Sequence, residues 1–222
     1  MKSFSLHNFF LFFACLAVVA LASCSASITV TAKNNDDVTL NFTSSFSKQA
    51  QEALLSLTGA QENSKNRSLI SADDVKSFLF SSQAANVKAD VSPQNQITAS
   101  GDFAGISDKN LSALNILKRT PTSLTLSLGP EQIAAFYNFL PEDTRSYFDL
   151  LMIPCLNDEK MDIAEYTELL ASVYGTTLAQ EIVNGQIKIE LKSGNPEKSV
   201  KAKLTLGELF TQTEQKTWSV SW

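Results

Sequence analysis

The stretch QIKIELKSGNPEKSVKAKLTL, residues 186–206, decides the fold class of this chain. Apolar and polar residues alternate on both sides of Ser193-Gly194-Asn195-Pro196, a tetrapeptide rich in turn formers. This two-residue period is typical of strands that bury one face, and the central turn predicts an antiparallel hairpin. The side chains expected to face the core are Ile187, Ile189, Leu191, Val200, Ala202, Leu204 and Leu206.

The same alternation predicts further strands on either side of this hairpin. Residues 28–33 and 38–43 flank the turn cluster Asn34-Asn35-Asp36-Asp37, and residues 87–91 and 97–103 flank Ser92-Pro93-Gln94-Asn95. Single strands are expected at 124–128, which is followed by Gly129-Pro130, and at 217–222. Hairpins in this number predict a sheet that is mainly antiparallel.

Helical periodicity fills much of the remaining chain. Apolar residues recur at helical spacing in residues 47–57, 75–79, 111–117 and, above all, 130–183. Pro130 and Pro141 suit first turns of helices, and Asp162 with Glu165 forms a capping-box signature. We therefore expect an α+β fold: an antiparallel sheet built from hairpins, helices packed on one of its faces, and a helical insertion near residues 130–183.

The N-terminus has the pattern of an export signal. Lys2 precedes the uninterrupted apolar run 9–22, which is shorter than the roughly 20 residues that a membrane-spanning helix needs. The run ends in Leu21-Ala22-Ser23-Cys24, which resembles the lipobox of bacterial lipoproteins. The resemblance implies that residues 1–23 are a signal peptide and that Cys24 receives diacylglycerol, with palmitate-type acyl chains, as the first mature residue. Residues 24–222 would then form a single domain, anchored to a bacterial membrane on its periplasmic or surface side.

The segment from Cys24 to Phe42 is similar to the LppM-like envelope lipoproteins, in which a strand begins directly after the lipidated cysteine. That similarity implies a compact α+β domain without enzymatic activity, held close to the lipid. The first predicted strand starts only a few residues after Cys24, and four extended residues span at most about 14 Å. We therefore expect the domain to lie against the membrane surface.

Cysteine and histidine usage limits the chemistry of such a mature chain. The single histidine of the sequence, His7, lies in the predicted signal together with Cys15. The mature chain would therefore have no histidine, and Cys155 would be its one free thiol, because Cys24 would carry the lipid. Loss of His7 excludes Ser–His–Asp catalysis and histidine-bound metals. We expect Cys155, in an apolar neighbourhood, to be buried and inert, and we expect no cofactor. The net charge of −5, or −6 without Lys2, disfavours a nucleic-acid partner.

One enzymatic alternative remains open. Ser45-Phe46-Ser47-Lys48 fits the S-x-x-K motif of penicillin-binding acyl-transfer enzymes, with Ser45 as nucleophile and Lys48 as its partner. Lys192-Ser193-Gly194 fits their third motif, whereas Ser107-Asp108-Lys109 departs from the second. This reading requires Ser45 to open a helix and Lys192 to lie beside it.

The polar face of the C-terminal hairpin carries the candidate binding residues. Four lysines, with Glu190 among them, are candidates to face anionic lipid headgroups: Lys188, Lys192, Lys201 and Lys203. The acidic residues Asp158, Glu159, Asp162 and Glu165 are weaker candidates for a calcium site, because no glycine lies in mid-loop. The sequence therefore favours a non-enzymatic envelope protein that binds a partner protein or an amphiphile at the membrane. A structural, surface-exposed lipoprotein is a further alternative.

Overall fold

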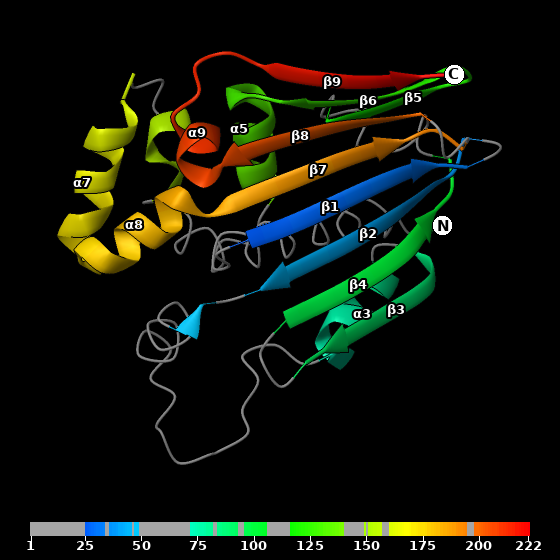
Figure 1. Ribbon diagram of the computed structural model, residues 1–222, viewed down its shortest axis with the longest axis horizontal. Coiled ribbons are helices and arrows are strands. Elements are labelled where there is room, and N and C mark those ends of the chain that lie inside the picture. Colours follow the sequence, from blue (N-terminus) through cyan, green and yellow to red (C-terminus); the bar gives the residue numbers. More distant parts are fainter. Residues whose placement is uncertain are drawn as a thin grey trace.

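The computed structural model describes residues 25–33, 36–45, 47–48, 72–81, 84–92, 96–105, 116–139, 149, 151–156, 160–194 and 198–222. The predicted signal 1–23, Cys24, the helix expected at 47–57 beyond Lys48, Pro141 and the loop with Asp158 and Glu159 lie outside these residues. Within them the chain has the predicted α+β fold, with strands and helices arranged as in Figure 1.

Six strands form the larger sheet, in the order β3-β4-β2-β1-β7-β8. Their bounds are β1 Ser25–Ala32, β2 Val38–Ser45, β3 Ala85–Val91, β4 Gln96–Phe103, β7 Gln186–Lys192 and β8 Ser199–Thr205. The three predicted hairpins are confirmed as the antiparallel pairs β1–β2, β3–β4 and β7–β8. Alternate residues face the core because each of these strands is apolar on one side only.

One pairing of this sheet departs from the antiparallel pattern. β1 and β7 run parallel, with Ser25 beside Gln186 and Thr31 beside Lys192. Parallel neighbours need a long connection between them, and here helices α7 (Ile163–Tyr174) and α8 (Thr176–Asn184) lead the chain back to the end at which β1 begins. β7 therefore enters the sheet in the same direction as β1 (Figure 1).

A second, three-stranded sheet has the order β5-β6-β9. It consists of β5 Leu117–Thr120, β6 Ser123–Leu128 and β9 Lys216–Ser221, all antiparallel. The strands predicted at 124–128 and 217–222 are thus confirmed. The prediction of a helix reaching Leu117 is wrong at that residue, because Leu117 and Arg119 alternate inward as the first half of a hairpin that turns at Pro121 and Thr122.

The helices confirm most of the predicted insertion and add one short element. Their bounds are α3 Ala72–Ser81, α5 Pro130–Phe139, residues 151–156, α7 Ile163–Tyr174, α8 Thr176–Asn184 and α9 Leu206–Phe210. Pro130 opens α5, and Asp162 and Glu165 form the predicted capping box of α7. Leu206 was expected to end a strand, but Thr205 caps α9 in a second box with Glu208, so Leu206 begins that helix.

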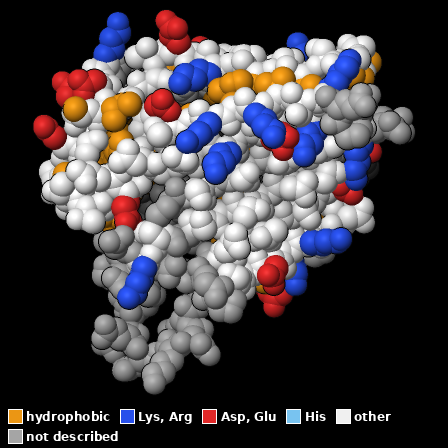
Figure 2. Space-filling model, viewed as in Figure 1, with side chains coloured by type: hydrophobic (Ala, Val, Ile, Leu, Met, Phe, Trp, Pro, Cys, Tyr) orange, Lys and Arg blue, Asp and Glu red, His pale blue; other side chains and the backbone are white. Residues whose placement is uncertain are grey.

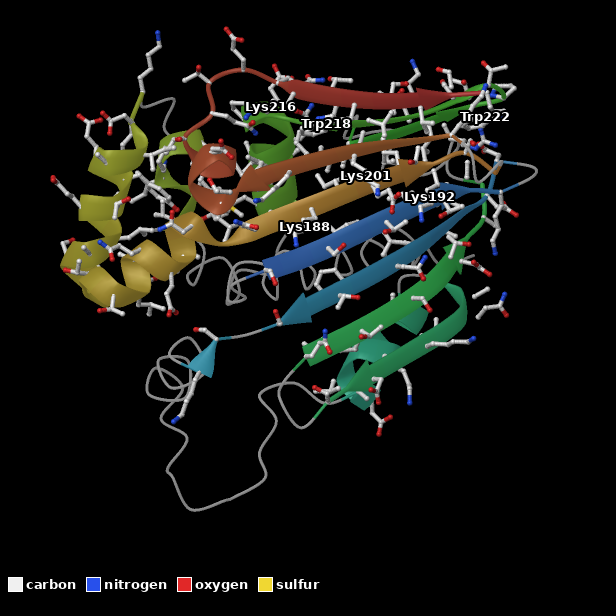
Figure 3. The ribbon with its side chains drawn as sticks, viewed as in Figure 1. Lys188, Lys192, Lys201, Lys216, Trp218 and Trp222 are labelled. Carbon is white, nitrogen blue, oxygen red and sulfur yellow. The ribbon has the colours of Figure 1, made fainter. Side chains whose placement is uncertain are left out.

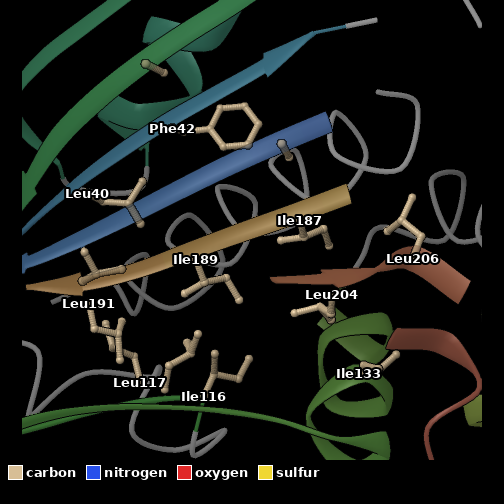
Figure 4. Packing of buried hydrophobic residues seen from close by; sticks show 14 of the residues in the cluster. Leu40, Phe42, Ile116, Leu117, Ile133, Ile187, Ile189, Leu191, Leu204 and Leu206 are labelled. Atoms are coloured by element: carbon tan, nitrogen blue, oxygen red, sulfur yellow. The ribbon is translucent and has the colours of Figure 1, made fainter. Parts of the chain in front are cut away.

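One hydrophobic core joins the two sheets and the helices. The apolar face of β1, β2 and β7 packs towards Ile116 and Leu117 at the start of the smaller sheet, and Ile133 of α5 approaches beside Leu204 (Figure 4). Helix α3 covers β3 and β4, with Leu79 fully buried. Since these layers cover one face of the larger sheet, its other face points outward.

Candidate binding face of the larger sheet

The outward side chains of the larger sheet form one broad polar surface, which we call the polar face. Its centre is built from small hydroxyl and amide side chains on the inner strands, and its charge lies mainly over β7 and β8 (Figure 2). On the three strands β1, β2 and β4 the central residues are Ser25, Ser27, Thr29, Thr31, Thr39, Asn41, Thr43, Ser45, Gln96, Thr98 and Ser100.

The strand register arranges these side chains in rows that cross the sheet. One row runs from Thr98 through Thr43 and Ser27 to Lys188 and Lys203. Neighbouring strands lie about 4.8 Å apart, so each row offers side chains at a short, regular spacing. Charged and hydroxyl groups of different strands are thereby brought onto one surface.

All four predicted headgroup-facing lysines lie on the polar face. Lys188 and Lys192 project from β7, and Lys201 and Lys203 come from β8 (Figure 3 labels the first three). The sequence thus predicted the correct face for these side chains, because Ile189 and Leu191 of β7 are buried and Ala202 of β8 is packed against the core. Whether this face binds lipid headgroups stays a prediction.

The four lysines differ in their partners. Glu190, the single acidic residue of β7 and β8, lies 3.2 Å from Nζ of Lys192 and 3.7 Å from Nζ of Lys201. Lys188 and Lys203 are directly opposite each other in the β7–β8 register, and both are exposed. Within the described part of the chain, neither of these two lysines forms an ion pair.

Ser45 occupies a strand end, which corrects the expectation that it opens a helix. It is the last residue of β2, and its Oγ lies 2.9 Å from Oγ of Ser25. Backbone pairing fixes Ser45 in this strand, since it is the register partner of both Ser25 and Gln96. Lys48 lies three residues beyond it and is exposed.

The other acyl-transfer motif lies at the far end of the sheet. Lys192 is the register partner of Thr31, whereas Ser45 is the partner of Ser25. At about 3.3 Å per residue, these two ends of β1 are roughly 20 Å apart. Ser193 belongs to the turn after β7, where its backbone N–H donates to the carbonyl oxygen of Lys198 over 3.0 Å. The described residues therefore do not bring Ser45 and Lys192 into one site.

Asp102 organises the opposite end of the polar face from Ser25. Its carboxylate accepts hydrogen bonds from Lys33 Nζ at 2.7 Å, Thr39 Oγ1 at 2.7 Å and Asn86 Nδ2 at 2.8 Å. The hydrogen bonds from Asn86, Lys33 and Thr39 lower the pKa of Asp102 from 3.8 to about 2. The three donors come from the turn after β1, from β2 and from β3, so this carboxylate links three segments to β4.

Cys155 is a buried thiol, as the sequence predicted. Its side chain is 5% exposed, and Sγ lies 2.9 Å from the carbonyl oxygen of Phe210 as a hydrogen-bond donor. Burial raises the pKa of Cys155 to about 12, so the thiolate is disfavoured. Cys155 therefore joins residues 151–156 to α9.

Asp162 and Glu165 cap the N-terminus of α7. The Asp162 carboxylate accepts from the backbone N–H of Glu165 at 2.9 Å, and the Glu165 carboxylate accepts from the backbone N–H of Asp162 at 3.0 Å. In the described ranges, no cluster of three or more Asp, Glu, His or Cys residues is placed to hold a metal ion.

Sequence reasoning did not single out Arg119. It is 8% exposed, and its Nη2 donates to the carbonyl oxygen of Lys33 at 3.0 Å, which joins the smaller sheet to the turn after β1. Trp222 is partly buried at the margin of the core, and its ring covers the guanidinium of Arg119. The pattern of inward residues at 117 and 119 was the available signal for a buried arginine.

No described helix is both long and apolar enough to span a bilayer. Comparison of the chain with protein-family models, with curated proteins and with solved structures gave no match.

Proposed function

We propose that this chain is a lipid-anchored, non-enzymatic protein of a bacterial cell envelope, attached through Cys24 and holding its domain at the membrane surface. The polar face of the larger sheet presents its binding surface there, to a partner protein or to an amphiphile. The observation that carries this proposal is the position of β1, which starts at Ser25, the residue that follows Cys24.

The start of β1 leaves no linker between the proposed lipid and the sheet. Ser25 already has register partners on both sides, Ser45 of β2 and Gln186 of β7. Adjacent Cα atoms are about 3.8 Å apart, so acyl chains on Cys24 would join the sheet almost directly. Two or three acyl chains suffice for stable anchoring, at about 0.8 kcal/mol for each buried CH₂. Such a short attachment would hold one end of the polar face near the headgroups.

The side-chain chemistry supports binding in preference to catalysis. The mature chain expected from the lipobox has no histidine, and the pKa of its remaining thiol, Cys155, is raised by burial. Ser45 and Lys192 lie at opposite ends of the larger sheet. The polar face, by contrast, offers hydroxyl, amide and ammonium groups at regular spacing over six strands.

The proposal is tested by metabolic labelling with an alkyne-bearing palmitate analogue in bacteria that express the chain. We expect the wild-type protein to carry the label and to sediment with membranes. Cys24→Ser should lose the label, while Cys155→Ser serves as a matched control and should keep it. Label that persists in Cys24→Ser, or a wild-type protein without label, would reject the lipid anchor.

A further inference from the structure

Two like charges face each other on the polar face, and no described residue forms an ion pair with either of them. Lys188 and Lys203 are register partners in the antiparallel pair β7–β8, and both side chains are exposed. Like charges directly opposite on antiparallel strands destabilise the pair. An anion bound between the two ammonium groups would turn this repulsion into attraction.

Protection of a sheet edge does not account for this arrangement. Lysines on an edge strand discourage pairing with other chains, and β8 is an edge of the larger sheet. Lys188, however, belongs to β7, which is covered by β1 on one side and by β8 on the other. Its charge is therefore not needed to block an edge.

The positive charge is concentrated on one part of the face. β7 and β8 carry four lysines and one glutamate, Glu190, which forms ion pairs with Lys192 and Lys201. At the far side of the face, Lys33 is paired with Asp102 at 2.7 Å. The net charge of the chain is −5, so the patch over β7 and β8 is positive although the chain as a whole is negative.

The patch lies close to the end of the sheet where the lipid is proposed. Lys188 is the register partner of Ser27, which is three residues from Cys24 along the chain. Three extended residues span about 10 Å, and each further strand adds about 4.8 Å across the sheet. Lys188 and Lys203 are therefore the lysines of the patch closest to the proposed anchor, at a distance comparable with the Debye length of about 10 Å at 0.1 M salt.

The surroundings of the two lysines suit phosphate groups on a planar surface. Ser27 and Thr43 lie in the same row and add hydroxyl donors beside the ammonium groups. The row crosses a face of small side chains, over which lysines gather in Figure 2. A broad face of this kind fits an array of headgroups better than a single small anion in a pocket.

We propose that the Lys188–Lys203 pair docks the polar face onto anionic phospholipid headgroups, so that the domain lies with this face against the membrane. The inference rests on the proposed lipid anchor, and it names the surface that the anchored domain binds. Charge complementarity supplies the attraction, and the short attachment at residue 24 keeps the pair within reach of the phosphates.

The test is a lysine footprint of the protein as extracted from membranes. The protein is reconstituted into vesicles of phosphatidylcholine alone or of an equal mixture with phosphatidylglycerol, and a water-soluble reagent acylates exposed amines. Peptide mass spectrometry then gives the labelling rate of each lysine. We expect the rates at Lys188 and Lys203 to fall severalfold in the anionic vesicles, and to recover at high salt. Lys118, on the outer face of the smaller sheet, is the internal reference and should not change.

Variants separate docking from a general effect of charge. In the wild type the anionic vesicles should also protect the neighbouring Lys192 and Lys201, and in Lys188→Gln/Lys203→Gln this protection should disappear. A charge-matched control, Lys118→Gln/Lys160→Gln, changes two exposed lysines outside the larger sheet and should retain that protection. The proposal would be overturned if the labelling rates of Lys188 and Lys203, like that of Lys118, were the same in both kinds of vesicle. Protection by soluble glycerol phosphate with phosphatidylcholine vesicles would also overturn it, since the pair would then bind a free phosphate.

The same experiment distinguishes a failure of docking from a failure of the anchor. The mass of the N-terminal peptide in the same digest shows whether Cys24 carries lipid. If it does not, the protein is added from solution to the same vesicles, and the footprint at Lys188 and Lys203 is read in the same way. Protection of Lys188 and Lys203 in a protein whose Cys24 carries no lipid would reject the anchor and retain docking. A lipidated Cys24 without protection of the two lysines would retain the anchor and reject docking.

Discussion

The guanidinium carbon of Arg119 lies 4.5 Å from the centre of the Trp222 ring. The same guanidinium donates to the backbone carbonyls of Thr120 and, through Nη2, of Lys33. Arg119 belongs to β5 of the smaller sheet, whereas Lys33 follows β1 of the larger one. Arg119 therefore connects Trp222 and the smaller sheet to the larger sheet, at the opposite end of β1 from Ser25.

The stacking of Arg119 on Trp222 should contribute measurably to stability. A cation–π contact gives about 0.5–2 kcal/mol, depending on desolvation, and Arg119 is largely buried. We expect a double-mutant cycle with Arg119→Met and Trp222→Leu to give a coupling free energy in that range, from urea unfolding of the four proteins. Strictly additive losses would show that the two side chains act independently.

The Asp102 carboxylate should make stability depend on acid pH. Its pKa in the folded chain, about 2, lies below the ordinary value of 3.8, so the stabilisation is present above pH 3.8 and is lost as the pH falls through about 2. Asp102→Asn should lower the free energy of unfolding by about 1–2 kcal/mol near neutral pH. The difference between wild type and variant should shrink in acid. A difference that stays constant over the whole titration would contradict the pKa assignment.

Gly207 is required where α9 meets α8. A Cβ at this position would lie 2.7 Å from Cγ1 of Val183 and 3.2 Å from its carbonyl oxygen. Alanine normally favours a helix over glycine, yet here we expect Gly207→Ala to destabilise the protein by about 1–3 kcal/mol through overpacking. Val183→Ala removes the nearest methyl group, so the double variant should lose less than the two single variants together. Urea midpoints at constant m-value measure this, and a stabilised Gly207→Ala would refute the close packing.

Cys155 should be unreactive until the protein unfolds. Burial raises the pKa of this thiol to about 12, and Sγ is directed at the carbonyl oxygen of Phe210. We expect an aromatic disulfide reagent at mildly alkaline pH to detect no thiol in the folded protein and one thiol per mature chain in denaturant. A second thiol in denaturant would indicate that Cys24 is unmodified, and rapid reaction of the folded protein would contradict burial.

The hairpins could be predicted because their signal is local. The alternation of apolar and polar residues from Ile187 to Leu191 indicates which side chains are buried. The turn after Lys192 makes the next strand antiparallel. The parallel pairing of β1 with β7 could not be predicted in this way. It joins segments about 160 residues apart, and both strands show the same alternation that an antiparallel pair would show.

Two local features were misread because one signal masked another. Leu204 and Leu206 continue the strand alternation, which hid the Thr205 and Glu208 capping box that starts α9. Apolar residues up to Leu117 suggested a helix, although Leu117 and Arg119 are the inward residues of β5. In both places the tertiary contacts of a short element decided its conformation.

The sequence predicted which lysines lie on the polar face, and the structure showed which of them are paired with one another or with Glu190. Alternation was sufficient to place Lys188 and Lys203 on the polar face together with Lys192 and Lys201. Which lysines share Glu190, and which face each other, depends on the register of β7 with β8. The stacking of Arg119 on Trp222 depends on the contact of β5 and β9 through β6, which no local pattern encodes.

The covalent state of Cys24 decides whether the domain is anchored, which end of the sheet lies near the membrane and how many free thiols the mature chain has. The most direct measurement is the mass of the N-terminal peptide of the protein extracted from bacterial membranes. We predict a mature chain that begins at Cys24 and carries diacylglycerol on its sulfur, followed directly by Ser25 of β1. A chain that begins at another residue, or an unmodified Cys24, would contradict the lipid anchor.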